Sequence, residues 1–369
     1  MTPRKRVLLV LDRSAGGIAR HVAQLTEMMD GHDGLEIDVA GPSGLPLVMP
    51  KPMLPLEIPD GPIRGHRRAI ATLRSYLQQQ HYDVIHAHGL RAGIDAGLAA
   101  RGSDTKRVVT VHNLVHKDVA GKLKAPIYRR AESMVVRSND VVLCVSEEIG
   151  KRLHRAAPRV AHRVAVLHLG IGAAPSVSKS RDEVRSLLQV SDDQSLLVTA
   201  SRLAPQKALH VMIEAVGRMK APAALAILGE GPLEGELRAE AERLGVGNRV
   251  SFLGFRDDLA DQVAAADVFC LSSVWEGVPL SAQEAILLST PIVATDVGGM
   301  GELIRDGYSG WLVPPGDPTA LASAIDEVLA EPERARSFSD RAREELRRNF
   351  STEKMLERLR EIYSDDHAP

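Results

Sequence analysis

The stretch DVFCLSSVWEGVPLSAQEAILLSTPIVATDVGG, residues 267–299, contains one complete unit of the fold. DVFCL and PIVAT are apolar runs of strand length, and the segment between them has the pattern of a helix that begins near Pro279. Continuous Val, Ile and Leu runs are typical of parallel strands that are buried on both faces. The stretch therefore predicts a strand, a loop, a helix and a second strand of an α/β sheet.

The same alternation of strand and helix patterns runs through the whole chain. Apolar runs of strand length cover residues 6–11, 35–40, 83–89, 107–112, 140–146, 163–169, 195–203, 223–231, 249–255, 268–274, 291–296 and 310–317. Helical patterns separate these runs, which is the signature of a doubly wound α/β fold. We therefore predict two Rossmann-like domains, one in each half of the chain.

The length of 369 residues also favours two domains. We place the first domain at 1–176 and the second at 177–350, because the stretch 172–181 is polar and contains Pro and Ser. Residues 351–369 predict a final helix with one apolar face. Ligands of open α/β sheets bind beyond the carboxyl ends of the strands, so we expect the two domains to face each other across a cleft.

Composition excludes several classes of protein. With 44% hydrophobic and 25% charged residues, the chain is typical of a soluble globular protein. No apolar run approaches the ~20 residues of a membrane span. Cys144 and Cys270 lie in apolar runs without the spacing of a zinc site or a disulfide framework, which favours a reducing cytoplasm.

Charge is distributed unevenly along the chain. Residues 1–178 carry a net charge of +9, and residues 179–369 carry −11. The low aromatic content and the lack of a known motif argue against nucleic acid. The basic half suits an acidic substrate or an anionic membrane surface, although uneven surface charge without function explains it equally well. The sequence does not predict an oligomeric state.

Two cations follow the first strand of the second half, in SRLAPQKALHVMIEA, residues 201–215. Arg202 ends the strand pattern and Lys207 precedes the helix. A helix N-terminus with two nearby cations is a site for a doubly charged anion. The alternative is a solvated loop with two ordinary surface charges.

Glycines at two strand ends allow a ligand to approach the backbone. Gly229 and Gly231 follow a strand in AILGEGP, and Gly16 and Gly17 follow the first strand of the chain. Neither site has the dinucleotide pattern or a Walker A motif. Tight strand-to-helix turns would need the same glycines.

Histidines gather at strand ends of the first half, as His86 and His88 in VIHAHG and as His112 and His116 in VTVHNLVH. No Asp, Glu or Cys completes a metal-ligand spacing, so we expect no metal. His112, followed by Asn113, is the best polar candidate for a binding site. The alternative for each histidine is a structural role in the core.

Glu276 and Glu284 flank the helix start of the opening stretch. Glu276 falls in the loop and Glu284 about one turn into the helix, with unpaired backbone N–H groups between them. Two carboxylates around such a turn could hold the hydroxyls of a sugar and of a ribose. An acidic loop followed by an ordinary helical glutamate is the alternative.

Six motifs together resemble those of the retaining glycosyltransferases of family 4. They are SRLAPQK (201–207), LGEGP (228–232), FLGFRDDL (252–259), WEGVPLSAQE (275–284), ATDVGGMGELI (294–304) and GYSGWLVPPGDP (307–318). The resemblance covers nearly the whole chain and is densest over 196–330. It implies the GT-B fold, with the final helix crossing back onto the first domain.

The resemblance also implies roles for individual residues. Donor binding would involve Gly17, Arg202, Lys207, Gly229, Phe255, Arg256, Glu276, Gly277, Val278, Pro279, Leu280 and Glu284. Catalysis would involve Glu276, His112, Lys207 and Arg202, with His112 beside the anomeric carbon. Gly16, His88 and Asn113 would contact the acceptor.

The activity so implied is transfer of a hexose-type sugar from a UDP- or GDP-linked donor to a hydroxyl acceptor. The configuration at the anomeric carbon would be retained by same-face attack, without a metal, a further cofactor or a protein nucleophile. A sugar-nucleotide epimerase of the same fold and a non-catalytic sugar-nucleotide binding protein are the rival functions. The basic segments 61–77 and 116–130 would allow peripheral contact with the inner face of the membrane, and an ordinary solvated basic face is the favoured alternative.

Overall fold

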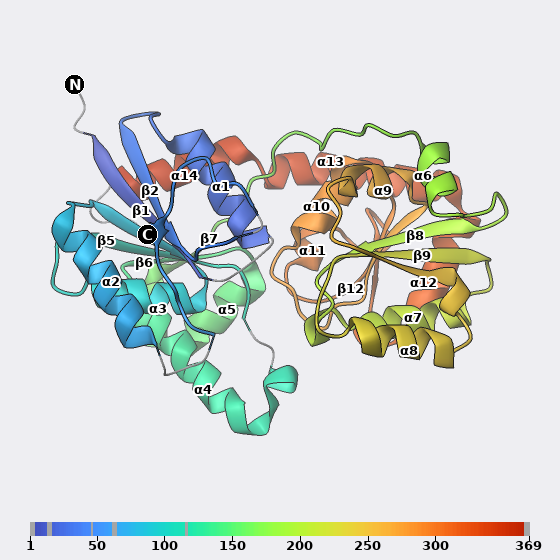
Figure 1. Cartoon of the computed structure of the whole chain (residues 1–369), viewed down its shortest axis with the longest axis horizontal. Helices are drawn as coiled ribbons and strands as arrows, with labels where there is room; N and C mark the ends of the chain where they lie inside the picture. Colours follow the sequence, from blue (N-terminus) through green and yellow to red (C-terminus); the bar gives the residue numbers. More distant parts are fainter. Residues whose placement is uncertain (1–3, 13–16, 46, 61–64, 115–116, 365–369) are drawn as a thin grey trace. The chain divides into compact units, whose positions relative to one another are not determined.

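The computed structural model describes residues 4–12, 17–45, 47–60, 65–114 and 117–364. The chain folds into two compact units. The first unit contains Met1–Gly170 and Thr352–Pro369, and the second contains Ile171–Ser351 (Figure 1). The final residues of the chain therefore belong to the first unit.

The change from the first to the second unit comes at Gly170, a few residues before the position expected from composition. The reason is a backbone pairing that the sequence does not reveal. The N–H of Ile171 donates to the carbonyl of Phe350 over 3.1 Å, and Ile171 also forms a bridge with Ser351. Ile171 is thus tied to the end of the second unit.

The first unit is built on a parallel sheet in the order β3-β2-β1-β4-β5-β6-β7. Its strands are β1 (Lys5–Leu11), β2 (Leu35–Gly41), β3 (Leu54–Pro55), β4 (Val84–His88), β5 (Lys106–Val111), β6 (Val141–Cys144) and β7 (Val164–Val166). Every residue of β4 and of β6 is buried, as the continuous apolar runs predict.

Helices join these strands and include the last helix of the chain. They are α1 (Gly17–Met29), α2 (His66–Gln79), α3 (Leu90–Ala99), α4 (Lys117–Ser138), α5 (Glu147–Ala156), the 3-10 helix η1 (Pro158–Arg163) and α14 (Thr352–Ser364). The apolar face of α14 lies in the same core as β1, and Figure 1 shows this red helix among the blue elements. Lys5 Nζ donates to the carbonyl of Tyr363 over 3.0 Å, and Lys106 Nζ donates to that of Ile362 over 2.6 Å.

The second unit contains a parallel sheet in the order β10-β9-β8-β11-β12-β13. Its strands are β8 (Ser195–Ala200), β9 (Ala223–Leu228), β10 (Val250–Gly254), β11 (Val268–Leu271), β12 (Ile292–Thr295) and β13 (Trp311–Val313). Its helices are α6 (Arg181–Leu187), η2 (Pro205–Lys207), α7 (Leu209–Arg218), α8 (Glu234–Arg243), η3 (Gly247–Arg249), α9 (Leu259–Ala265), α10 (Leu280–Leu287), α11 (Met300–Leu303), α12 (Pro318–Ala330) and α13 (Pro332–Asn349).

Both sheets reverse their strand order at one point, which is where doubly wound folds bind ligands. In the first unit the reversal lies between β1 and β4, which pair from Val7–Val84 to Leu11–His88. In the second it lies between β8 and β11, which pair at Leu197–Val268 and Val198–Phe269. The loops after these strands are therefore the first places to look for a site.

The predicted fold class is confirmed, with small differences at element ends. The short strand β3 was not predicted, because two residues that include a proline produce no periodic pattern. Pro279 precedes α10 as its N-cap, and the helix begins at Leu280. Within the described residues, no helix combines the length and the apolarity that a membrane crossing requires.

Candidate functional site

The loops after β8 and β11 bring together a lysine and a glutamate that are 69 positions apart. Lys207 Nζ lies 2.5 Å from Glu276 Oε1, and the two side chains are only 17% and 6% exposed. The Ser273 hydroxyl donates to the same carboxylate oxygen over 2.5 Å. The Gln206 amide reaches Glu276 Oε2 at 3.4 Å and the Trp275 carbonyl at 2.9 Å. Glu276 is thus held from two loops and faces a cation.

Backbone contacts fix these two loops against each other. Ala208, the N-cap of α7, adopts a left-handed conformation with φ 44° and ψ 42°. The Ser272 hydroxyl donates to the carbonyls of Lys207 and Ala208 over 2.9 and 3.2 Å. The N–H of Val274 donates to the carbonyl of Gln206 over 2.9 Å. The position of Lys207 is therefore set by the loop after β11.

A third loop, after β12, supports the Glu276 backbone. Thr295 Oγ1 donates to the Ser273 carbonyl over 2.5 Å, and the N–H of Gly299 donates to the Gly277 carbonyl over 2.7 Å. Gly298 has φ +58°, and a Cβ placed there would lie 2.0 Å from the Glu276 carbonyl oxygen. Only glycine fits this close approach.

Helix α10 begins directly after this carboxylate. Gly277, Val278 and Pro279 are buried, and Glu284 is partly exposed within the helix. Among the described residues no side chain caps the N-terminus of α10. Its first N–H groups therefore point toward the Glu276 loop as donors for an anion or a hydroxyl. The predicted group Glu276, Gly277, Val278, Pro279, Leu280 and Glu284 forms one continuous segment of this site.

Arg202 and Gly229 lie at neighbouring strand ends, since β8 pairs with β9. The Arg202 side chain is exposed. Gly229 has φ +125°, and a Cβ there would lie 2.1 Å from the Ser201 carbonyl oxygen. The N–H of Gly229 donates to the Gly254 carbonyl over 2.7 Å. Close packing of these loops therefore explains why residue 229 is a glycine. This agrees with the alternative of a tight strand-to-helix turn.

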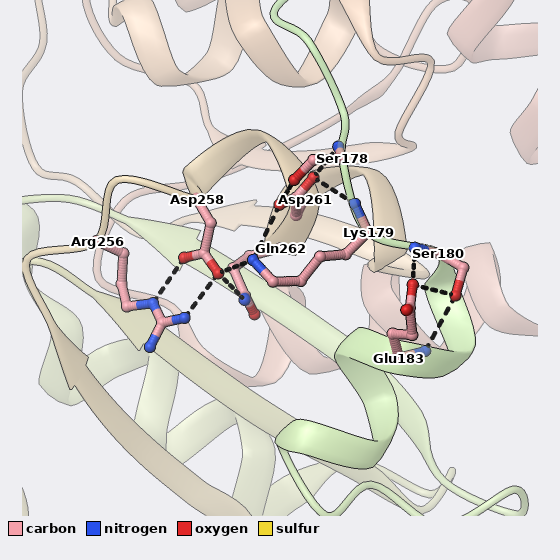
Figure 2. Close-up of polar contacts among 8 residues, drawn as sticks. All are labelled: Ser178, Lys179, Ser180, Glu183, Arg256, Asp258, Asp261 and Gln262. Carbon is pink, nitrogen blue, oxygen red and sulfur yellow. Dashed lines mark hydrogen bonds and ion pairs between the residues drawn. The ribbon is translucent and has the colours of Figure 1, made fainter.

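Arg256, predicted to meet the base of a donor, is bound to its own loop (Figure 2). Its Nε and Nη2 donate to the two oxygens of Asp258, both over 2.7 Å. Lys179 Nζ binds Asp258 over 2.8 Å and Asp261 over 3.2 Å (Figure 2). The guanidinium of Arg256 holds the pKa of the Asp258 carboxyl well below its usual range. The adjacent Phe255 is 67% exposed, so the ring, more than the guanidinium, is available to a ligand.

The first unit has a cluster of buried histidines at the carboxyl ends of its strands. His86 and His88 come from β4, His112 follows β5, and His21 comes from α1. His88 Nδ1 lies 3.2 Å from His112 Nε2, and the His21 ring lies 5.6 Å from the rings of both. Asn113 is exposed, and so is Gly17 at the start of α1. Gly16 and His116 lie outside the described residues.

Burial keeps this cluster uncharged. It lowers the pKa of His21 to about 4 and that of His86 to about 3, and it lowers those of His88 and His112 well below the usual value. The four rings are therefore neutral at physiological pH. In the part of the chain that the structure describes, no three His, Cys, Asp or Glu side chains are arranged to hold a metal ion.

The sequence did not predict several residues around Glu276 and in the histidine cluster. Ser273 and Gln206 contact Glu276, but serine and glutamine in a loop carry no signal of their own. Gly298 lies in a predicted motif, yet its contact with Glu276 depends on how two loops meet. His21 shares its buried helix face with Val22 and Leu25, and that periodicity was the only available signal.

Two family models match the chain in sequence. The model described as Glycosyltransferase Family 4 matches residues 15–174. The model described as Glycosyl transferases group 1 matches residues 180–345. The two matches divide the chain near the change from the first unit to the second.

Individual relatives and solved structures agree with these matches. EpsD of Bacillus subtilis (strain 168) is 29% identical over 345 residues, which cover 90% of this chain and 89% of EpsD. The N-acetyl-alpha-D-glucosaminyl L-malate synthase of Bacillus anthracis is 26% identical over 78% of this chain and 76% of its own. The crystal structure of Anabaena HepE with UDP and glucose superposes with a TM-score of 0.81 at 22% identity, covering 97% of this chain and 99% of HepE.

Proposed function

Since the chain belongs to the family 4 type of glycosyltransferases with the GT-B fold, we propose that it is a retaining, metal-independent hexosyltransferase. The donor is a sugar linked to UDP or GDP, and the acceptor is a hydroxyl group. The transferred sugar keeps its anomeric configuration.

The observation that carries this proposal is the Lys207–Glu276 pair at the strand-order reversal of the second unit. Two charged side chains lose much of their hydration when they are buried, and hydrophobic residues at such positions often stabilise a fold equally well. A buried pair with helix α10 beginning beside it is more useful for binding than for stability. It offers a cation to a phosphate and a carboxylate to hydroxyls.

Charge complementarity supports a diphosphate at this position. An ammonium group has three N–H donors, and within the described residues Lys207 Nζ uses one of them on Glu276. The others, the exposed guanidinium of Arg202 and the first N–H groups of α10 suit phosphate oxygens. These groups would stabilise the negative charge that develops on the leaving diphosphate, which is the task that a metal performs in other transferases.

The reaction then needs no nucleophile from the protein. The bond between the anomeric carbon and the diphosphate oxygen breaks, and the acceptor oxygen bonds to the same face of that carbon. The acceptor proton passes to the departing diphosphate. Glu276 orients the hydroxyls of the sugar and favours the positive charge that develops on its ring, and Glu284 takes the ribose hydroxyls.

The relatives support the donor class. HepE crystallised with UDP, with UDP and glucose, and with UDP-glucose. A relative from Escherichia coli, 23% identical over 308 residues, is a UDP-Gal:alpha-D-GlcNAc-diphosphoundecaprenol alpha-1,3-galactosyltransferase. For the present chain we propose a nucleoside-diphosphate sugar without choosing between the two bases.

A cytoplasmic location with peripheral membrane contact belongs to the same proposal. Helix α2 exposes Arg67, Arg68 and Arg74 and buries only Ala69 and Leu73. Such a basic face is attracted to anionic lipid. Co-sedimentation with vesicles that contain phosphatidylglycerol, compared with neutral vesicles, tests the contact. Equal binding to both would exclude it.

Thermal unfolding with a panel of UDP- and GDP-sugars, in the presence of EDTA, tests the function. A donor at 100 times its Kd should stabilise the protein by about 2.7 kcal/mol. We expect one nucleotide family to raise the Tm and the Lys207→Ala variant to lose the effect. No shift with any donor would contradict the proposal, and conversion of a donor to its epimer without an acceptor would identify an epimerase. Binding without any turnover in the presence of cell-derived acceptors would identify a binding protein.

A further inference from the structure

His88 occupies the centre of the histidine cluster in the first unit. Its ring centroid lies 4.4 Å from that of His86, 5.4 Å from that of His112 and 5.6 Å from that of His21. It is fully buried. A polar ring in such a position requires hydrogen-bond partners, and the pattern of those partners is unequal among the four histidines.

His86 is held in place by hydrogen bonds at both of its ring nitrogens. His86 Nε2 lies 2.8 Å from Thr110 Oγ1, and His86 Nδ1 lies 2.6 Å from Tyr363 Oη. Both partners are hydroxyls, which accept or donate as required. His86 therefore has no nitrogen left for His88, and the two rings meet only in a tilted contact with an interplanar angle of 31°.

Among the described residues, His88 has a single hydrogen-bond partner, His112. His88 Nδ1 lies 3.2 Å from His112 Nε2. Within the described residues, His88 Nε2 is sealed from solvent and has no partner. His112 Nδ1 also has no partner among the described residues, but this nitrogen is not sealed from solvent. His112 thus turns one nitrogen to His88 and keeps the other open to a ligand.

Neutral rings carry one proton each, so the bond between them has two possible directions. If His112 donated, the proton of His88 would be on Nε2, as a buried N–H without an acceptor. Buried N–H groups without an acceptor are rare, and acceptors with a free lone pair are less so. If His88 donates through Nδ1, its Nε2 is only an acceptor and the proton of His112 is on Nδ1.

We propose that His88 is a positioning residue, which holds His112 in the tautomer with its proton on Nδ1 and so makes His112 a hydrogen-bond donor toward the substrate. The bond to one ring nitrogen decides which proton the other can offer. The catalytic consequence rests on the proposed glycosyl transfer. Same-face transfer, in which the leaving diphosphate takes the acceptor proton, uses no protein base, so His112 is free to act as a hydrogen-bond donor to a substrate oxygen. The tautomer itself does not depend on that function.

Nitrogen-15 NMR of the full chain with labelled histidine tests the tautomer directly. Spectra that correlate ring carbon-bound protons with both nitrogens distinguish a protonated from an unprotonated nitrogen, and His112→Gln identifies the His112 signals. We expect a protonated Nδ1 and an unprotonated Nε2 for His112 at pH 7.5. A proton on Nε2 of His112 would overturn the proposal, whether or not the chain transfers sugar.

Three variants test the role of His88. In His88→Leu the donor is lost, and we expect His112 to populate both tautomers and kcat to fall at least 10-fold, with the KM for the donor changing less than twofold. In His88→Asn the amide nitrogen replaces Nδ1, and most of kcat should return. His21→Leu removes an equally buried ring that touches His88 and His112 without a hydrogen bond to either, and it should leave the His112 tautomer unchanged.

The outcomes separate this proposal from the proposed function. An unchanged His112 tautomer in His88→Leu, or an unchanged kcat with a changed tautomer, would overturn the positioning role. If His88→Leu does not fold, His88→Asn and the wild-type spectrum still decide the tautomer. A chain that shows the expected tautomer but no transfer with any donor would refute the proposed function and leave the assignment of the proton intact.

Discussion

The two units share a sheet order up to their sixth strand, yet the polar groups at their strand ends differ in charge. In the second unit a largely buried lysine and a buried glutamate neutralise each other by pairing. In the first unit four buried histidines are neutral because burial has lowered their pKa values. One scaffold thus supports a charged site and an uncharged one.

The difference matches the two kinds of group that a sugar transferase handles. A diphosphate needs fixed positive charge and helix N–H groups, which the loops after β8 and β11 supply. Sugar and acceptor hydroxyls need neutral donors and acceptors, and in the proposed function His112 Nδ1 is such a group. Variants that change each site separately test this difference.

The largest effect is expected from breaking the charged pair. Lys207→Ala or Glu276→Ala should lower kcat/KM by about 10³-fold or more, because the leaving diphosphate or the sugar loses its charged partner. The remaining unpaired charge should also destabilise the second unit by about 3 kcal/mol without unfolding it. Turnover of the identified donor and urea unfolding followed by fluorescence measure the two effects.

The matched control is Glu276→Gln, which keeps the hydrogen bond from Ser273 but removes the charge. We expect it to restore little of the activity and only part of the stability, because the charge of Lys207 stays unpaired. Turnover close to wild type in either alanine variant would remove the charged pair from the mechanism.

The next effect concerns the glycine that supports Glu276. Gly298→Ala would place a methyl group 2.0 Å from the Glu276 carbonyl oxygen at a positive φ, so the loop must move. We expect kcat to fall about 10²-fold, since a displacement of about 1 Å at such a site has that effect. Gly301→Ala is the control, because its Cβ would meet nothing closer than 3.7 Å. Equal activities of the two variants would show that the loop position is unimportant.

The two units should also differ in how their folding stability depends on pH. Above pH 6.5 a buried histidine is neutral in both the folded and the unfolded chain. As the pH falls from 6.5 toward the folded pKa, about 4 for His21, the unfolded chain binds a proton that the folded chain does not. The loss of stability should therefore approach about 1.4 kcal/mol per pH unit for each such histidine once the pH is well below 6.5.

The chain offers an internal control for this measurement. Both tryptophans, Trp275 and Trp311, lie in the second unit, whose single histidine is the exposed His210. Tryptophan fluorescence should report an unfolding transition with little pH dependence between pH 7 and 5. Amide hydrogen exchange in β4 and β5 of the first unit should report the loss of stability, and His21→Leu should reduce its slope. Equal slopes in both units would contradict the contrast.

The smallest effect is expected from the Lys179 contacts shown in Figure 2. Partly exposed ion pairs contribute little, so Lys179→Met should lower the Tm of the second unit by roughly 1–3 °C. Because Asp258 still pairs with Arg256, donor affinity should change less than twofold. A large loss of donor affinity in a calorimetric titration would show that Lys179 controls the loop that carries Phe255.

Local patterns predicted the fold because the continuous apolar runs are the strands themselves. They also predicted Lys207 and Glu276, since each lies in a distinctive motif after a strand. Contacts between loops were not predictable in the same way. Arg256 has the position of a ligand contact in the sequence, but the structure pairs it with Asp258. His21 looked like part of an ordinary helix, and only the packing of α1 brings it to His88.

In the proposed function, cations of the second unit hold the donor diphosphate without a metal. Calorimetric titration of wild-type protein and of the Arg202→Ala and Lys207→Ala variants with UDP and GDP, in EDTA, tests this role of the two cations. We expect one of the two nucleotides to bind the wild-type protein, and each variant to bind it at least 10-fold more weakly, as the loss of a charge-assisted hydrogen bond requires. Equal affinity in all three proteins, or binding that requires an added metal, would contradict the claim.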